Sequence, residues 1–96
     1  MFARTSTWTG SDSTLEDWAR HAMEKVAPMV KELPGNAGAV FLIDRQARRG
    51  LTLTLWDSEA AALASDQVAD RSRESTIAAT GVQLLETGRY EVAARI

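Results

Sequence analysis

The segment between residues 37 and 56 limits the fold more than any other part of the sequence. It holds two runs of strand-forming residues, AGAVFLIDR and LTLTLW, joined by the short loop QARRG. Such a loop, with Gly50 at its end, is typical of a β-hairpin. Leu51, Leu53 and Leu55 share one face of the second strand, because side chains alternate along a strand. The first strand is apolar on both faces, so the hairpin is expected to be covered on both sides rather than to keep one face in water.

Two further elements precede the hairpin. Residues 2–9 are rich in Thr and aromatic side chains and predict a first strand. Ser13 and Glu16 have the spacing of a capping box, in which each side chain accepts a backbone N–H of the first helical turn. Apolar residues then recur every three or four positions as far as the Pro34–Gly35 pair, which predicts a helix that ends there. Pro28 falls on the outer side of this helix and is expected to bend it.

Two helices and a strand are expected after the hairpin. A helix should begin at residue 57 or 58, where Asp and Ser can cap it. An unbroken continuation would turn polar side chains inward, so we expect a break near residues 65–66 and a new helix to Thr80, capped by Gly81. The alternating run RYEVAARI, residues 89–96, predicts the last strand. The residues of the first of these helices that are expected to face inward are Ala60, Leu63 and Ala64.

The predicted order of elements is strand, helix, strand, strand, helix, strand. This is the order of the ferredoxin-like α+β sandwich, a four-stranded antiparallel sheet with both helices on one face. The whole chain, residues 1–96, is expected to form this single domain. Leaving several Leu, Val or Ile side chains exposed on the other face would forgo several kcal/mol, at about 25 cal/mol per Å² of apolar surface. We therefore expect a homodimer in which two copies pack sheet against sheet.

The composition excludes several classes of function. The net charge is −2, which argues against binding to nucleic acid through clustered Lys and Arg. The chain has no Cys, and His21 is its only His, so a metal site within one chain is not expected. It shows neither a signal-peptide pattern nor the roughly 18 apolar residues of a membrane span. These features predict a cytoplasmic protein without nucleic-acid, metal or membrane partners.

The chain resembles a known family in four features. They are the order of its elements, the PG pair that closes the first helix, the hairpin AVFLIDRQARRGLTLTLWDSEAAL with its Trp-x-Ser-x-Glu-Ala ending, and the terminal RYEV. The family comprises the antibiotic biosynthesis monooxygenase-like (ABM) domains of the dimeric α+β barrel superfamily. The resemblance covers nearly the whole chain and implies the dimeric barrel fold. It is less specific for the reaction, because the superfamily includes quinone-forming monooxygenases, haem-degrading enzymes and members of unknown role.

The resemblance also implies where a ligand would bind. In that family the cleft lies between the helices and the sheet, and the Trp that ends the third strand, matched by Trp56, borders it. The haem-degrading branch also uses an Asn near the end of the first strand and a His in the second helix. Ser6 and Thr7 lie nearest the Asn position. Asp66 and Gln67 lie nearest the His position. None of these is an ordinary haem ligand, so haem degradation is not expected.

The expected activity is that of a cofactor-independent monooxygenase acting on a polycyclic or quinol-like aromatic small molecule. A phenolic substrate can itself give an electron to oxygen if a dry cleft orients it and stabilises the developing anion. No cofactor is expected. The candidate catalytic residues are His21, a base near neutral pH, and Arg71, which is expected to turn inward with Ser72 and Ser75. The candidate ligand-binding residues are Trp56, Trp18, Phe41, Arg4 and Trp8.

Each candidate also has a structural interpretation. Trp56 can instead cover the end of the core and pack on the following helix, and Trp18 fits a core position. His21 falls on the flank of the apolar stripe and can be a solvated surface residue. Arg71 faces either a polar cavity or the dimer rim, and Tyr90 fits a strand edge or an interface. The alternative for the whole protein is a non-catalytic dimer that binds a small ligand, or one whose cleft is filled by its own side chains.

Overall fold

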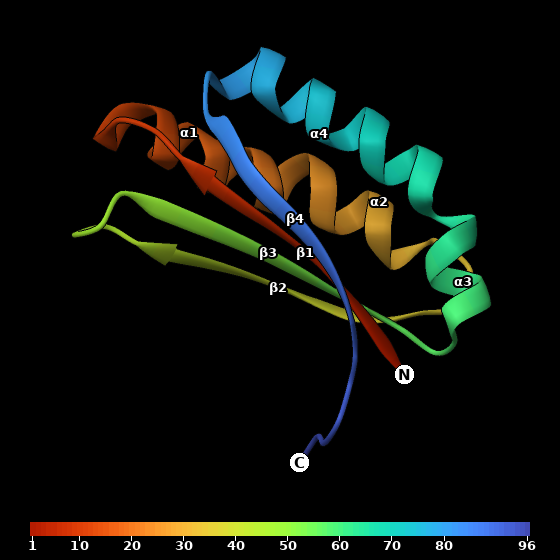
Figure 1. Ribbon diagram of the computed structural model, residues 1–96. Helices are drawn as coiled ribbons and strands as arrows, with labels where there is room; N and C mark the ends of the chain where they lie inside the picture. Colours follow the sequence, from red (N-terminus) through yellow and green to blue (C-terminus); the bar gives the residue numbers. More distant parts are fainter.

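The computed structural model describes residues 1–96, and all four of its strands belong to one sheet (Figure 1). The strand order is β2-β3-β1-β4, and every neighbouring pair is antiparallel. The helices all lie on one face of this sheet, as expected for the ferredoxin-like fold. In chain order the elements are β1 (Phe2–Thr9), α1 (Asp12–His21), the π-helical turn η1 (Ala22–Val26), α2 (Ala27–Lys31), β2 (Asn36–Asp44), β3 (Arg49–Trp56), α3 (Glu59–Ala64), α4 (Asp66–Thr80) and β4 (Gln83–Glu91).

The first helical segment starts earlier than predicted and is interrupted by a π-helical turn. Its N-cap is Ser11, whose side chain accepts the Thr14 N–H at 3.2 Å, so the predicted Ser13–Glu16 capping box is wrong. In η1 the N–H of Ala27 bonds to the carbonyl of Ala22, five residues back. Pro28 follows directly and has no N–H to donate, and its ring crowds the preceding turn. The expected bend is therefore a local widening of the helix.

The break after the hairpin lies where the sequence predicts it. Ser58 caps α3, Ser65 separates α3 from α4, and Gly81 ends α4 with a φ of 81°. The prediction that Ala60, Leu63 and Ala64 face inward is wrong. All three are exposed, Leu63 by 48%, and Ala62 is the buried residue of α3. The helix turns Ala61 and Ala62 toward the rest of the protein instead, and Ala61 lies against Gly35, where an added Cβ would be 2.4 Å from the Cβ of Ala61.

The last strand is displaced from its predicted position. It runs from Gln83 to Glu91, whereas residues 92–96 lie outside any strand. The alternation in the sequence continues past Glu91, but its partner β1 does not, because Phe2 already pairs with Glu91. The remaining residues have no neighbour with which to form a sheet. A register shift between Thr7 and Trp8 weakens the pattern at the start of this strand.

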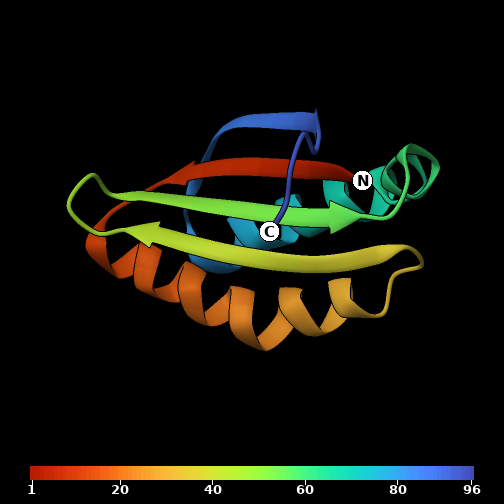
Figure 2. The same cartoon turned by 90° about the horizontal axis from the view of Figure 1, so that it is seen from below.

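The two faces of the sheet have different surroundings. Trp8 on the helix side forms the core with Leu15 and Trp18 of α1 and with Val82. The opposite face carries Leu51, Leu53 and Leu55 of β3 beside the exposed Val40 and Leu42 of β2. Figure 2 shows this face from below, where no helix covers it and only the C-terminal segment passes in front of the strands. The apolar second face predicted from the hairpin is therefore present.

Candidate functional site

A cavity of about 60 Å³ lies between the helix side of the sheet and the helices. Side chains from β1, β2 and β3 form its floor, and side chains from α1, η1, α2 and α4 form its walls. It collects the residues that the sequence singles out for ligand binding and one of the two catalytic candidates. They are Arg4, Trp8, Trp18, Phe41 and Trp56, with His21 at the edge.

Three tryptophans give the cavity fixed aromatic walls. Trp8, Trp18 and Trp56 are buried, although they are far apart in the sequence. The indole N–H of Trp56 donates to the Thr54 hydroxyl at 3.0 Å, and that of Trp8 donates to Thr52 at 3.2 Å. These bonds satisfy the polar edge of each ring inside an apolar region. Because side chains two apart share a strand face, the alternation in LTLTLW places both threonines on the cavity side.

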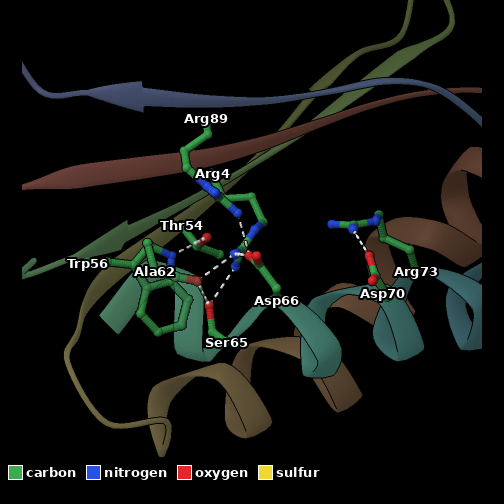
Figure 3. Close-up of polar contacts among 9 residues, drawn as sticks. All are labelled: Arg4, Thr54, Trp56, Ala62, Ser65, Asp66, Asp70, Arg73 and Arg89. Carbon is green, nitrogen blue, oxygen red and sulfur yellow. Dashed lines mark hydrogen bonds and ion pairs between the residues drawn. The ribbon is translucent and has the colours of Figure 1, made fainter. Parts of the chain in front are cut away.

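Arg4 forms the polar end of the cavity and is 8% exposed. Its Nη1 donates to the Ser65 hydroxyl at 2.7 Å, and its Nη2 donates to the Ala62 carbonyl at 2.7 Å and to the carboxylate of Asp66 (Figure 3). Its guanidinium also lies over the ring of Trp56. Burial lowers the pKa of Arg4, with Asp66 acting in the opposite direction. The residue stays a cation at neutral pH and joins β1 to the α3–α4 junction.

Asp66 is shared by two arginines. It accepts hydrogen bonds from both Arg4 and Arg89, which reach it from neighbouring strands. Partial burial acts to raise the pKa of Asp66, but the hydrogen bonds and positive charges of Arg89 and Arg4 outweigh it, and the pKa lies below its ordinary value. Asp66 is therefore a carboxylate at neutral pH, and it is occupied in an ion-pair network rather than free to act as a base.

Arg71 does not turn toward the cavity, which corrects the expectation from the sequence. It is exposed, and the cavity is lined instead by Ser72 and Arg73 of the same helix. The expected break is present at Ser65, but the helix that follows it has a different phase from the predicted one. Ser65 itself faces inward, and Ser72 and Arg73 follow it by seven and eight residues, on the same face. The buried serine at the break is the signal that identifies Arg73.

His21 lies between the cavity and an open groove of about 520 Å³. The groove separates α1, η1 and α2 from α4, and Lys25 and Arg71 also line it. Val26, Met29 and Val68 line both spaces, so the groove is the outer approach to the cavity. His21 is half-buried there, in reach of a group that enters from this side.

The haem-related positions are arranged differently from a haem ligand set. Ser6 lines the cavity, whereas its neighbour Thr7 is on the opposite face of the sheet. Asp66 is bound to its arginines, and Gln67 is exposed. No group of three or more His, Cys, Asp or Glu side chains is placed to hold a metal ion. None of the helices is both long and apolar enough to span a membrane.

The order of its elements and the strand order of its sheet place the chain in the ferredoxin-like class that includes the dimeric α+β barrels. No protein-family model and no curated protein matches it. Among solved structures it is similar to a monooxygenase of Streptomyces coelicolor, from the gene ActVA-Orf6, in complex with nanaomycin D. The two are 17% identical, and the match covers 99% of this chain and 91% of that one at a TM-score of 0.70.

Two further structures show that this fold carries different chemistry. SnoaB of Streptomyces nogalater, a cofactor-independent oxygenase, matches with 14% identity over 99% of this chain and 95% of its own, at a TM-score of 0.67. The haem degrader MhuD of Mycobacterium tuberculosis, with two haems bound in its active site, is 20% identical. The match covers 100% of this chain and 99% of that one, at a TM-score of 0.69. The chain therefore has the fold of the ABM-type monooxygenases, and at these identities the likeness concerns the fold alone.

Proposed function

We propose that the protein is a cofactor-independent monooxygenase of the ABM type that acts on a polycyclic or quinol-like small molecule. The observation that carries the proposal is the cavity itself. Its walls are the rings of Trp8, Trp18 and Trp56, and its polar end is a buried arginine. Such an enclosure can hold a flat electron-rich ring away from water next to a fixed positive charge.

The chemistry assigned to the cavity needs no group besides substrate and oxygen. When an anthrone-type CH₂ becomes a carbonyl, one atom of O₂ enters the substrate and the other leaves as water with the two hydrogens. The aromatic walls orient the ring, and Arg4 stabilises the anion that forms when a phenolic or benzylic proton is lost. His21, at the open side of the cavity, is the group placed to take that proton.

The volume of the cavity sets a condition on this function. A ligand pocket for a drug-sized molecule has about 300 Å³ or more, and the cavity has about 60 Å³. A polycyclic substrate must therefore push side chains aside. Met29 lies between cavity and groove just after the π-helical turn, and an unbranched thioether moves easily. Its displacement would join the cavity to the groove.

The same small volume supports the second candidate, a non-catalytic protein that binds a small ligand or fills its cleft with its own side chains. The two are separated by measuring oxygen uptake and melting temperature with quinols, anthrones, flavins and haem, in buffer with a chelator. The enzyme should consume oxygen with an anthrone and place ¹⁸O from ¹⁸O₂ in the product. Thermal stabilisation without oxygen uptake would support the non-catalytic protein instead.

Variants link the measured activity to the cavity. Trp56→Phe removes the hydrogen bond to Thr54 but keeps an aromatic ring, so it should lower kcat/KM at least several-fold in a folded protein. Leu63→Ala, on the exposed side of α3, is the matched control and should leave kcat/KM unchanged. Equal activity of Trp56→Phe and the control would place the reaction outside this cavity.

The functional unit that we propose is a homodimer formed through the bare face of the sheet. That face carries Val40, Leu42 and Tyr90 in exposed positions around the leucines of β3. Covering it would recover several kcal/mol at about 25 cal/mol per Å². Residues 92–96 project on this side, held by a bond from Val92 to Met1, with Ile96 fully exposed. A second copy of the chain, which presents the same apolar face, is the occupant that this geometry supports. Cytoplasmic location stays a prediction.

A further inference from the structure

A second hollow, of about 260 Å³, lies on the other side of α4 from the groove, against β4. No apolar side chain lines it. Its charged lining consists of Arg4, Arg73 and Arg89 with Asp66 and Asp70 (Figure 3). Arg4 and Arg73 line this hollow and also the tryptophan cavity. The two arginines therefore form the boundary between an apolar space and a charged one.

The hollow carries an uncompensated positive charge. Three guanidinium groups face two carboxylates, which leaves a net charge of +1. Asp66 is divided between Arg4 and Arg89, and Asp70 pairs with Arg73 alone. One further negative charge would neutralise the site, whereas a doubly charged group would exceed what it can balance.

Arg73 is the arginine that a ligand can recruit most easily. Its side chain is only 17% exposed, yet its partner Asp70 is 67% exposed and lies three residues away on the same helix. A pair three residues apart on a helix contributes little to stability, and the exposed carboxylate of Asp70 can return to water when Arg73 changes partner. Arg4, by contrast, is held by Ser65, by the Ala62 carbonyl and by Asp66.

We propose that this hollow binds the carboxylate of an aromatic carboxylic acid whose ring lies in the tryptophan cavity. Arg73 exchanges Asp70 for the ligand carboxylate, and Arg89 contributes from β4. A guanidinium matches a planar carboxylate with two parallel hydrogen bonds, and a carboxylate carries the single charge that the site lacks. This inference rests on the proposed use of the cavity for an aromatic ligand and adds the chemical class of that ligand.

The electrostatics of Arg4 point the same way. Burial is the main cause that lowers the pKa of Arg4, and the charges of Arg89 and Arg73 lower it further against the opposing effect of Asp66. The three cations thus repel one another across the hollow. An anion between them would relieve that repulsion in a partly water-excluded space, where charges interact more strongly than in bulk water.

The test compares two probes of the same shape, anthraquinone-2-carboxylate and anthraquinone-2-carboxamide, by calorimetric titration at low salt. The wild type should bind the carboxylate about tenfold more tightly, as expected for a charge-assisted pair. Added NaCl should reduce that preference. Arg73→Gln should bring the two affinities together, because it removes the partner of the carboxylate, and Arg73→Lys should keep part of the preference. Arg71→Gln, on the same helix but outside the hollow, is the matched control and should keep all of it.

The outcomes separate this inference from the proposed reaction. A preference that depends on Arg73, found together with no oxygen uptake, would keep the carboxylate site and remove the monooxygenase. Oxygen uptake with an anthrone, found together with equal affinities for the two probes, would keep the monooxygenase and remove the carboxylate site. Failure of both probes to bind at millimolar concentration would overturn the carboxylate site. A loss of preference in Arg71→Gln equal to that in Arg73→Gln would overturn it as well. Arg73 has no hydrogen-bond partner besides Asp70, so Arg73→Gln is expected to fold. The melting temperature of each variant checks this.

Discussion

Arg4 lies over the ring of Trp56, with its guanidinium carbon 5.7 Å from the ring centroid. The two residues are 8% and 1% exposed, so the contact is shielded from water, and a desolvated cation–π contact contributes about 2 kcal/mol. The same guanidinium ties β1 to Ser65 and Asp66 at the start of α4. One side chain thus connects the aromatic wall of the cavity with its polar end, and a change at either residue should affect both stability and binding.

Arg4→Met should lower the free energy of unfolding by about 2–4 kcal/mol, measured by urea denaturation. Met fills most of the space but donates to neither the Ser65 hydroxyl nor the Ala62 carbonyl, although that carbonyl keeps its bond from Ser65. Removing one partner of a buried ion pair costs about 3–5 kcal/mol. The loss should be somewhat smaller here because Asp66 keeps Arg89. Arg20→Met, which removes an exposed pair with Asp17, is the control and should cost less than about 1 kcal/mol. Similar losses in the two variants would contradict the role assigned to Arg4.

Asp66 should make stability depend on pH in the acid range. Its pKa is lower in the folded protein than the value of about 3.9 in an unfolded chain. A carboxyl group with a depressed folded pKa contributes stability that is fully present above the unfolded pKa and is lost as the pH falls through the folded pKa. The free energy of unfolding should therefore decrease as the pH drops below about 4, and it should decrease less steeply in Asp66→Asn.

The comparison between wild type and Asp66→Asn is the informative measurement, because Glu16 acts in the same pH range. The hydrogen bond from Arg45, followed by its charge, lowers the pKa of Glu16 as well. Glu16 is present in both proteins, so its effect cancels in the difference. Parallel curves for wild type and variant between pH 5 and pH 2 would show that the Asp66 network adds no stability.

Gly50 should not tolerate a side chain, because the ring of Trp18 lies against it. A Cβ at residue 50 would be 2.9 Å from both Cη2 and Cζ3 of that ring. Gly50→Ala should therefore cost about 1–3 kcal/mol, as overpacked cores do. In a Trp18→Phe background, which lacks those two atoms, the same change should cost less, and a double-mutant cycle measures the difference. Additive effects would mean that this contact is not the reason for glycine.

The sequence predicted most of the fold because its signals are local. The alternation in LTLTLW and the glycine loop define the hairpin, and Gly81 ends α4 where expected. The errors arise where distant partners decide. The last strand stops at Glu91 because β1 stops at Phe2, and Ala61 of α3 lies against Gly35, which is distant in the sequence. Neither partner can be identified from the periodicity of the segment itself.

The candidate site was predicted in part, for the same reason. Its aromatic residues stand out in the sequence, and the resemblance to the ABM domains marked Trp56. The partners of Arg4, by contrast, lie 58 to 62 residues away, so no sequence pattern connects them. The choice of Arg71 over Arg73 is an error of helical phase, since the position of a break does not fix which residues of the next helix face inward. The charged hollow beside α4 follows only from the three-dimensional arrangement.

Leu53 is the position at which the proposed dimer can be tested most directly. It lies at the centre of the bare face, paired with Thr5 on one side and Val40 on the other. Light scattering of the wild type at micromolar concentration should give a mass near twice 10.5 kDa. Leu53→Lys should give a mass near 10.5 kDa, because a lysine at the centre of an apolar interface cannot keep its charge in water. Leu63→Lys, which changes an exposed leucine on α3, is the control and should stay dimeric. A wild type that is monomeric throughout the micromolar range would remove the dimer and, with it, the reason for the apolar second face.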